Sequence, residues 1–78
     1  QIVHSMTWVD DAFEGDALAQ TSAHGDPRPC HVVSIGDREV QIDWGLRSTR
    51  IAPGQSVVLH DSTNTWVIGG GIAQHSPL

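Results

Sequence analysis

The stretch Pro53–Ala73, PGQSVVLHDSTNTWVIGGGIA, constrains the fold of this chain more than any other. Ser56–His60 and Thr65–Ile68 are short runs rich in β-branched residues, and the turn formers Asp61–Asn64 separate them. Two β-rich runs joined by a short polar loop predict a β-hairpin. Gly69–Gly71 follow directly, and we expect them to relieve crowding where a strand bends sharply.

Turn signals mark the other ends of short strands. Pro53 and Gly54 suit the two central positions of a type II turn, the second of which has a positive φ. Gly36-Asp37 is a two-residue connector that predicts a primed hairpin turn. Arg38–Trp44 gives the clearest alternation of apolar and polar residues, which predicts a strand with one buried face. Further strands are expected within Met6–Val9, Ala17–Ser22 and Cys30–Ile35, with loops at Asp10–Asp16 and His24–Pro29.

The whole pattern predicts an all-β fold. We count about six short strands and no sustained helical period, and closing so small a sheet removes its exposed edges. We therefore expect a small antiparallel six-stranded β-barrel that forms a single domain over residues 1–78, with flexible ends at residues 1–6 and 74–78. Because the chain starts with Gln1 and not Met, we also expect it to be part of a longer protein.

The charge balance bears on possible partners. Nine acidic residues stand against four arginines and no lysine, for a net charge of −5. Nucleic-acid binding is driven largely by neutralisation of phosphates, so this balance weighs against autonomous binding. Arg47 and Arg50 lie close together and leave two interpretations, solvated charges at the end of a strand or a local contact with phosphate. No apolar run approaches the ~18 residues of a membrane span, so no membrane partner is expected.

Few residues suggest catalysis or metal binding. Cys30 is the only cysteine, which fits a cytoplasmic protein. Strand alternation would place Cys30 and His31 on opposite faces. We therefore expect Cys30 to be a buried core residue and not a nucleophile. Gly69–Gly71 lacks the lysine and helix of a phosphate-binding loop. Neither the acidic stretch Asp10–Asp16 nor a set of Cys30, His31 and His60 has metal-ligand spacing, so no metal is expected. The tryptophans Trp44 and Trp66 lie in phase with core positions and are expected to pack inside.

A resemblance to a known family rests on two segments. Residues 53–61, PGQSVVLHD, and Gly69–Ala73, GGGIA, resemble the closing segment of the tRNA-specific 2-thiouridylases. Those proteins typically end with a Pro-Gly-Gln turn, a hydrophobic strand ending in aspartate, and a Gly-Gly-Gly-Ile segment. Thr7-Trp8-Val9 is similar to the family's entry into its last domain. The chain departs from the family at His60, which replaces a tyrosine, and at Ala19–His24, which replaces a basic aromatic strand.

The resemblance implies a function for the longer protein. The full enzyme would use ATP and Mg in an N-terminal domain to adenylate the wobble uridine of certain tRNAs and replace its 2-oxygen with sulfur from a donor protein. This chain would be its C-terminal β-barrel, similar to the second domain of elongation factor Tu. It would hold no cofactor and no catalytic residue, would be inactive alone, and would pack on the central domain and help to position tRNA.

Two hypotheses follow for the barrel itself. In the first, it contacts tRNA, and Arg47 and Arg50 are the candidate RNA-binding residues, while Pro53, Gly54, Gly69, Gly70 and Gly71 have structural roles. In the alternative, it is a structural or protein-interaction barrel with no RNA contact. A separate small-molecule site has little support, because a barrel of this size is filled by its own side chains.

Overall fold

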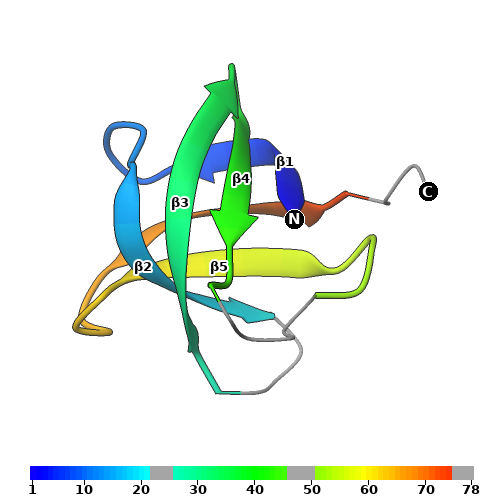
Figure 1. The fold of residues 1–78 in the computed structure, drawn as a ribbon. Helices are drawn as coiled ribbons and strands as arrows, with labels where there is room; N and C mark the ends of the chain where they lie inside the picture. Colours follow the sequence, from blue (N-terminus) through cyan, green and yellow to red (C-terminus); the bar gives the residue numbers. More distant parts are fainter. Residues whose placement is uncertain (22–25, 46–50, 75–78) are drawn as a thin grey trace.

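The computed structural model describes residues 1–21, 26–45 and 51–74. Within it, the stretch Pro53–Ala73, which most constrains the fold, contains a β-hairpin. Its strands are β5 (Ser56–Asp61) and β6 (Val67–Ala73), and they pair antiparallel from Ser56↔Ile72 to His60↔Val67 (Figure 1). The expected hairpin is therefore confirmed. Its second strand begins at Val67, two residues later than predicted, and continues through all three glycines.

Four further strands complete the fold. They are β1 (Ile2–Trp8), β2 (Gly15–Thr21), β3 (Arg28–Gly36) and β4 (Glu39–Asp43). The strand order is β1-β4-β3-β2-β5-β6, every pairing is antiparallel, and the sheet closes on itself. This confirms the predicted six-stranded antiparallel barrel. Within the three described ranges there is no helix of the length and apolarity needed to cross a membrane.

The N-terminal segment is a strand and not a flexible end. β1 pairs with β4 on one side and β6 on the other, so it closes the barrel. Val3 and Met6 are almost fully buried. The expectation of a flexible end over residues 1–6 is thus wrong for residues 2–6, because burial and two ladders of hydrogen bonds hold this segment in place.

The core consists of the inward-facing residues of the strands and of Ile51. Val40 and Ile42 of β4 and Val57 and Leu59 of β5 alternate with more exposed neighbours, as the period of a strand requires. Trp44 is also buried, and its Nε1 donates a hydrogen bond to Oε1 of Gln1 at 3.2 Å.

The β3–β4 connection differs from its prediction. The two turn residues are Asp37 and Arg38, one position later than expected, and only Arg38 has a positive φ, of 66°. A type I′ turn needs a positive φ at both central positions and a type II′ turn at the first, so this turn is not a primed one. Contacts with β1 hold Arg38 in place: its Nε donates to the Met6 carbonyl at 3.0 Å, and the Met6 amide donates to the Arg38 carbonyl at 2.9 Å.

Glycines allow β6 to lie unusually close to β1. A Cβ on Gly71 would lie 2.6 Å from the His4 carbonyl oxygen and 2.8 Å from the Met6 sulfur. On Gly69 it would lie 2.6 Å from the Thr7 carbonyl oxygen. The register of β1 and β6 shifts between His4 and Thr7, where Ser5 has a φ of 56°. The glycines thus lie where strands approach at an irregular point of the barrel.

Candidate docking site

The two arginines proposed for RNA contact, Arg47 and Arg50, lie outside the described residues. The turn that follows them is described. Gly54 has a φ of +86°, and the Gln55 amide donates to the Ala52 carbonyl at 3.2 Å across the turn that contains Pro53. The Gly54 amide donates to the Ala73 carbonyl at 2.8 Å, so this turn is joined to the end of β6.

The loop between β5 and β6 is organised by one carboxylate. Oδ1 of Asp61 accepts hydrogen bonds from the backbone amides of Thr65 and Trp66, both at 2.7 Å. Its Oδ2 accepts a hydrogen bond from the Thr63 hydroxyl. The Thr63 hydrogen bond, followed by those of the backbone amides, lowers the pKa of Asp61 to about 2. The carboxylate is therefore ionised at neutral pH while it shapes a loop that a row of turn formers predicts.

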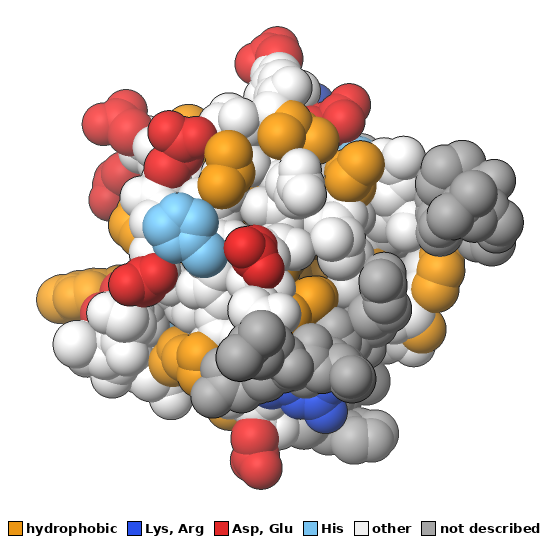
Figure 2. All heavy atoms as spheres, in the orientation of Figure 1, with side chains coloured by type: hydrophobic (Ala, Val, Ile, Leu, Met, Phe, Trp, Pro, Cys, Tyr) orange, Lys and Arg blue, Asp and Glu red, His pale blue; other side chains and the backbone are white. Residues whose placement is uncertain are grey.

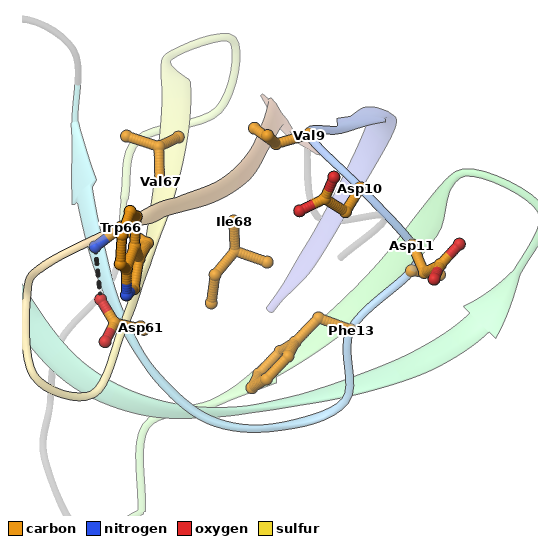
Figure 3. A pocket seen from close by; sticks show the side chains of 9 residues that line it. Val9, Asp10, Asp11, Phe13, Asp61, Trp66, Val67 and Ile68 are labelled. Atoms are coloured by element: carbon orange, nitrogen blue, oxygen red, sulfur yellow. Dashed lines mark hydrogen bonds between the residues drawn. The ribbon is translucent and has the colours of Figure 1, made fainter.

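This loop holds Trp66 at the surface. The residue is 70% exposed, so the prediction that it packs in the core is wrong. The reason is its position: Trp66 precedes β6 and belongs to the loop, so strand alternation does not apply to it. Figure 3 shows the Trp66 backbone amide bonded to Asp61 and the indole ring at the side of a surface pocket.

The indole forms one side of a pocket of about 370 Å³. Phe13 lies on the opposite side and Ile68 between them, as Figure 3 shows. Ala12, Val9 and Val67 complete the apolar lining, and the exposed fractions of the two valines are 64% and 49%. Phe13 and Ile68 also pack against the core, which holds these two lining side chains in place. Six apolar side chains from two segments that are distant in the sequence, residues 9–13 and 66–68, therefore meet at one place on the surface.

Acidic residues surround this apolar pocket. Asp10, Asp11 and Asp61 all line it, and none of the arginines that the structure describes does. In Figure 3 the Asp10 side chain points toward the side on which Ile68 lies, and the Asp11 side chain points away from it. Neither Asp10 nor Asp11 has a hydrogen-bonding or ion-pair partner within residues 1–21, 26–45 and 51–74. The pocket thus combines exposed aromatic surface with negative charge. Figure 2 shows that acidic side chains predominate over basic ones on the face in view.

An adjoining hollow of about 330 Å³ extends the apolar surface. It shares Val9 and Val67 with the pocket, and its lining also includes Trp8, Val58, Gly69 and Gly70. The two hollows together form an apolar surface over the β1 and β6 side of the barrel.

The other candidate residues do not form a reactive site. Cys30 faces the core, and His31 faces outward, as strand alternation predicts. Burial, with a smaller contribution from the charge of Asp16, raises the pKa of the Cys30 thiol to about 11. A thiol held in this form is a poor nucleophile. The His31 Nδ1 instead lies 3.0 Å from Oδ1 of Asp16 in an exposed pair on the outer face.

The acidic stretch Asp10–Asp16 spreads its carboxylates apart. Oε2 of Glu14 accepts the Ser34 amide at 2.7 Å, and Asp16 is bonded to His31, while Asp10 and Asp11 belong to the pocket. In the part of the chain that the structure describes, no three histidine, cysteine or acidic residues are placed to share a metal ion.

Sequence reasoning missed the pocket because its residues are far apart in the chain. Phe13 lies in the acidic segment that was expected to be a loop, and its side chain packs against the core. Phe13 and Trp66 come together only when β1 and β6 pair. The available signal was an aromatic residue directly after a run of turn formers, which indicates a loop tryptophan.

Comparison with known proteins gives the following matches. Residues 1–73 match the model of the aminomethyltransferase β-barrel domain family. The chain is 27% identical over 79 residues to a tRNA-specific 2-thiouridylase MnmA of Geotalea uraniireducens, and 34% identical over 67 residues to one of Roseiflexus castenholzii. These alignments cover 96% and 86% of this chain but only 20% and 17% of the relatives. No solved structure gives a significant match, so the likeness to elongation factor Tu stays a prediction.

Proposed function

This chain belongs to the aminomethyltransferase β-barrel domain family, and from that premise we propose that it is the accessory C-terminal domain of a tRNA-specific 2-thiouridylase. The observation that carries the proposal is the extent of the match, which includes all six strands of the barrel. The two relatives are about five times longer than the aligned chain. Their additional length would supply the ATP and Mg site, the catalytic cysteines and the contact with a sulfur donor protein, in the cytoplasm where tRNA is modified.

In this proposal the barrel packs on the central domain and helps to position tRNA. Deletion of the barrel from the full-length protein tests it, with the 2-thiouridine content of cellular tRNA measured by mass spectrometry in a strain that lacks its own enzyme. We expect thiolation to fall strongly and tRNA binding to weaken, and the isolated 78-residue chain to show no thiolation. Normal thiolation and unchanged tRNA binding after deletion would contradict an accessory role.

A contact between the barrel and tRNA can be tested at the two arginines. The double variant Arg47→Ala and Arg50→Ala in the full-length protein should weaken tRNA binding. It should also reduce the slope of log affinity against log salt by about 2, since each phosphate contact contributes about one unit. Arg28→Ala, which removes an exposed arginine from β3, is the control. Equal affinity and slope for the double variant and the parent would reject this role.

A protein-interaction barrel with no RNA contact is the second candidate. It is supported by the net charge of −5 and by the acidic residues around the Trp66 pocket, which disfavour an anionic partner there. A gel shift of the isolated chain with tRNA discriminates only in one direction, because weak binding is expected under both candidates. Clear binding at low salt would rule the second candidate out.

A further inference from the structure

We propose that the Trp66 pocket is a docking site for an arginine side chain on a protein segment, with an apolar neighbour of that arginine seated in the adjoining hollow. Trp66 and Phe13 supply the aromatic walls, and Asp10 supplies the carboxylate. This inference does not depend on tRNA contact and holds for either candidate function.

The aromatic wall favours a planar cation. Tryptophan gives the strongest cation–π attraction among the aromatic residues, and the guanidinium of arginine stacks on its face. At 70% exposure the Trp66 ring is available to a partner without any rearrangement of the loop. The hydrogen bonds from the backbone to Asp61 fix the loop that carries the ring, so the loop loses little conformational freedom on binding.

The charges favour arginine over other planar groups. A carboxylate can accept two parallel hydrogen bonds from a guanidinium, and Asp10 has no competing partner among the described residues. Asp61 is already bonded to its own loop, so it contributes negative potential and not a new bond. A nucleic-acid base could also stack on Trp66, but its phosphates would meet three carboxylates.

The size and lining of the site favour a peptide. A pocket of about 370 Å³ is near the lower end of the range for ligand sites, and Val9 and Ile68 suit the methylene stem of arginine. The hollow that shares Val9 and Val67 continues the apolar surface beyond the charged rim. One charged side chain with an apolar neighbour would therefore cover both.

The test is an NMR titration of the 78-residue chain with the capped tripeptide Leu-Arg-Leu. The three indole N–H signals are followed, after assignment of Trp66 by its loss in Trp66→Phe. We expect a saturable shift of the Trp66 signal, and binding about tenfold weaker for a peptide with uncharged citrulline in place of arginine. Trp66→Ala should abolish binding, as followed by backbone signals, whereas Ile35→Ala, an exposed apolar residue of β3, should not change it.

A matched pair of charge variants completes the test. The double variant Asp10→Asn and Asp11→Asn should weaken peptide binding about tenfold. The double variant Asp37→Asn and Glu39→Gln removes the same charge at the β3–β4 turn and should have a much smaller effect. Equal binding of the citrulline peptide, or equal effects of the two double variants, would overturn the proposal. It would also be overturned if tRNA bound at Trp66 more tightly than the peptide, or if dilution alone shifted Trp66 as in self-association.

Discussion

Asp61 shows how a single carboxylate can fix a loop by accepting hydrogen bonds from its own neighbours. The bonds from Thr63, Thr65 and Trp66 favour its charged form, which lowers its pKa from 3.8 to about 2. The unfolded chain lacks these bonds, so its Asp61 titrates near the ordinary value. The folded state therefore binds fewer protons than the unfolded state between these two values.

This difference predicts the pH dependence of stability at Asp61. The stabilisation should be fully present above pH 4 and should be lost as the pH falls toward 2, because the native pKa is the depressed one. Urea unfolding of the parent and of Asp61→Asn should give different midpoints at pH 7 and converging midpoints near pH 2. Asp37→Asn, in the other described hairpin turn, is the control. A gap between parent and Asp61→Asn that stays constant across this range would contradict the assignment.

Cys30 illustrates how burial controls the chemistry of a thiol. With its pKa raised from 9.0 to about 11, its thiolate population at pH 8 should be ~100-fold below that of a free cysteine. We expect a disulfide reagent to label the native protein slowly and the urea-unfolded protein rapidly. Asp16→Asn should speed native labelling only slightly, since the charge of Asp16 is the smaller cause. Native labelling as fast as that of the unfolded chain would show that the thiol is accessible.

At the scale of the element, β6 depends on its glycines for its place beside β1. A Cβ added to Gly71 or to Gly69 would lie only 2.6 Å from a carbonyl oxygen of β1, which is too close for van der Waals contact. A Cβ added to Gly70 would be less crowded, since its nearest atom would be the Val57 carbonyl oxygen of β5 at 3.0 Å. Glycine is thus required in this strand by close backbone packing, because none of the three has a positive φ.

Substitution of these glycines should therefore destabilise the barrel. Gly71→Ala and Gly69→Ala should each lower the free energy of unfolding by about 1–3 kcal/mol, because rigid backbone must move to admit the methyl group. Gly36→Ala is the matched control: a Cβ there meets nothing within 4 Å, and φ is not positive. Chemical denaturation of the three variants checks this. Equal stability of Gly71→Ala and Gly36→Ala would mean that β1 and β6 can separate without cost.

At the scale of the whole molecule, β1 is the strand that closes the sheet. It lies between β4 and β6, which are distant in the sequence, and it buries Val3 and Met6. Without it, β4 and β6 would become open edges with unpaired backbone groups. Closure is also what brings Val9, from the segment after β1, beside Val67 of β6 in the pocket.

Removal of residues 1–8 should thus prevent formation of the barrel. We expect the shortened chain to lose its dispersed NMR amide signals and to aggregate, since open edges pair between molecules. Thr7→Ala changes an exposed residue of β1 and should leave the dispersed spectrum intact. A folded, monomeric chain without these residues would show that closure by β1 is not required.

The sequence by itself determined the fold class, since short β-branched runs between glycines and prolines predict strands and turns through local physics, as at Val40, Ile42 and Ser56–His60. It also indicated the family, through the Pro-Gly-Gln and triple-glycine segments. Only the tertiary structure decided that residues 2–6 are a strand, that Trp66 is at the surface, and that Asp10 and Phe13 lie beside it. Those outcomes depend on which distant strands pair. The turn formers before Trp66 indicate a loop, but no local pattern encodes which residues that loop lies beside.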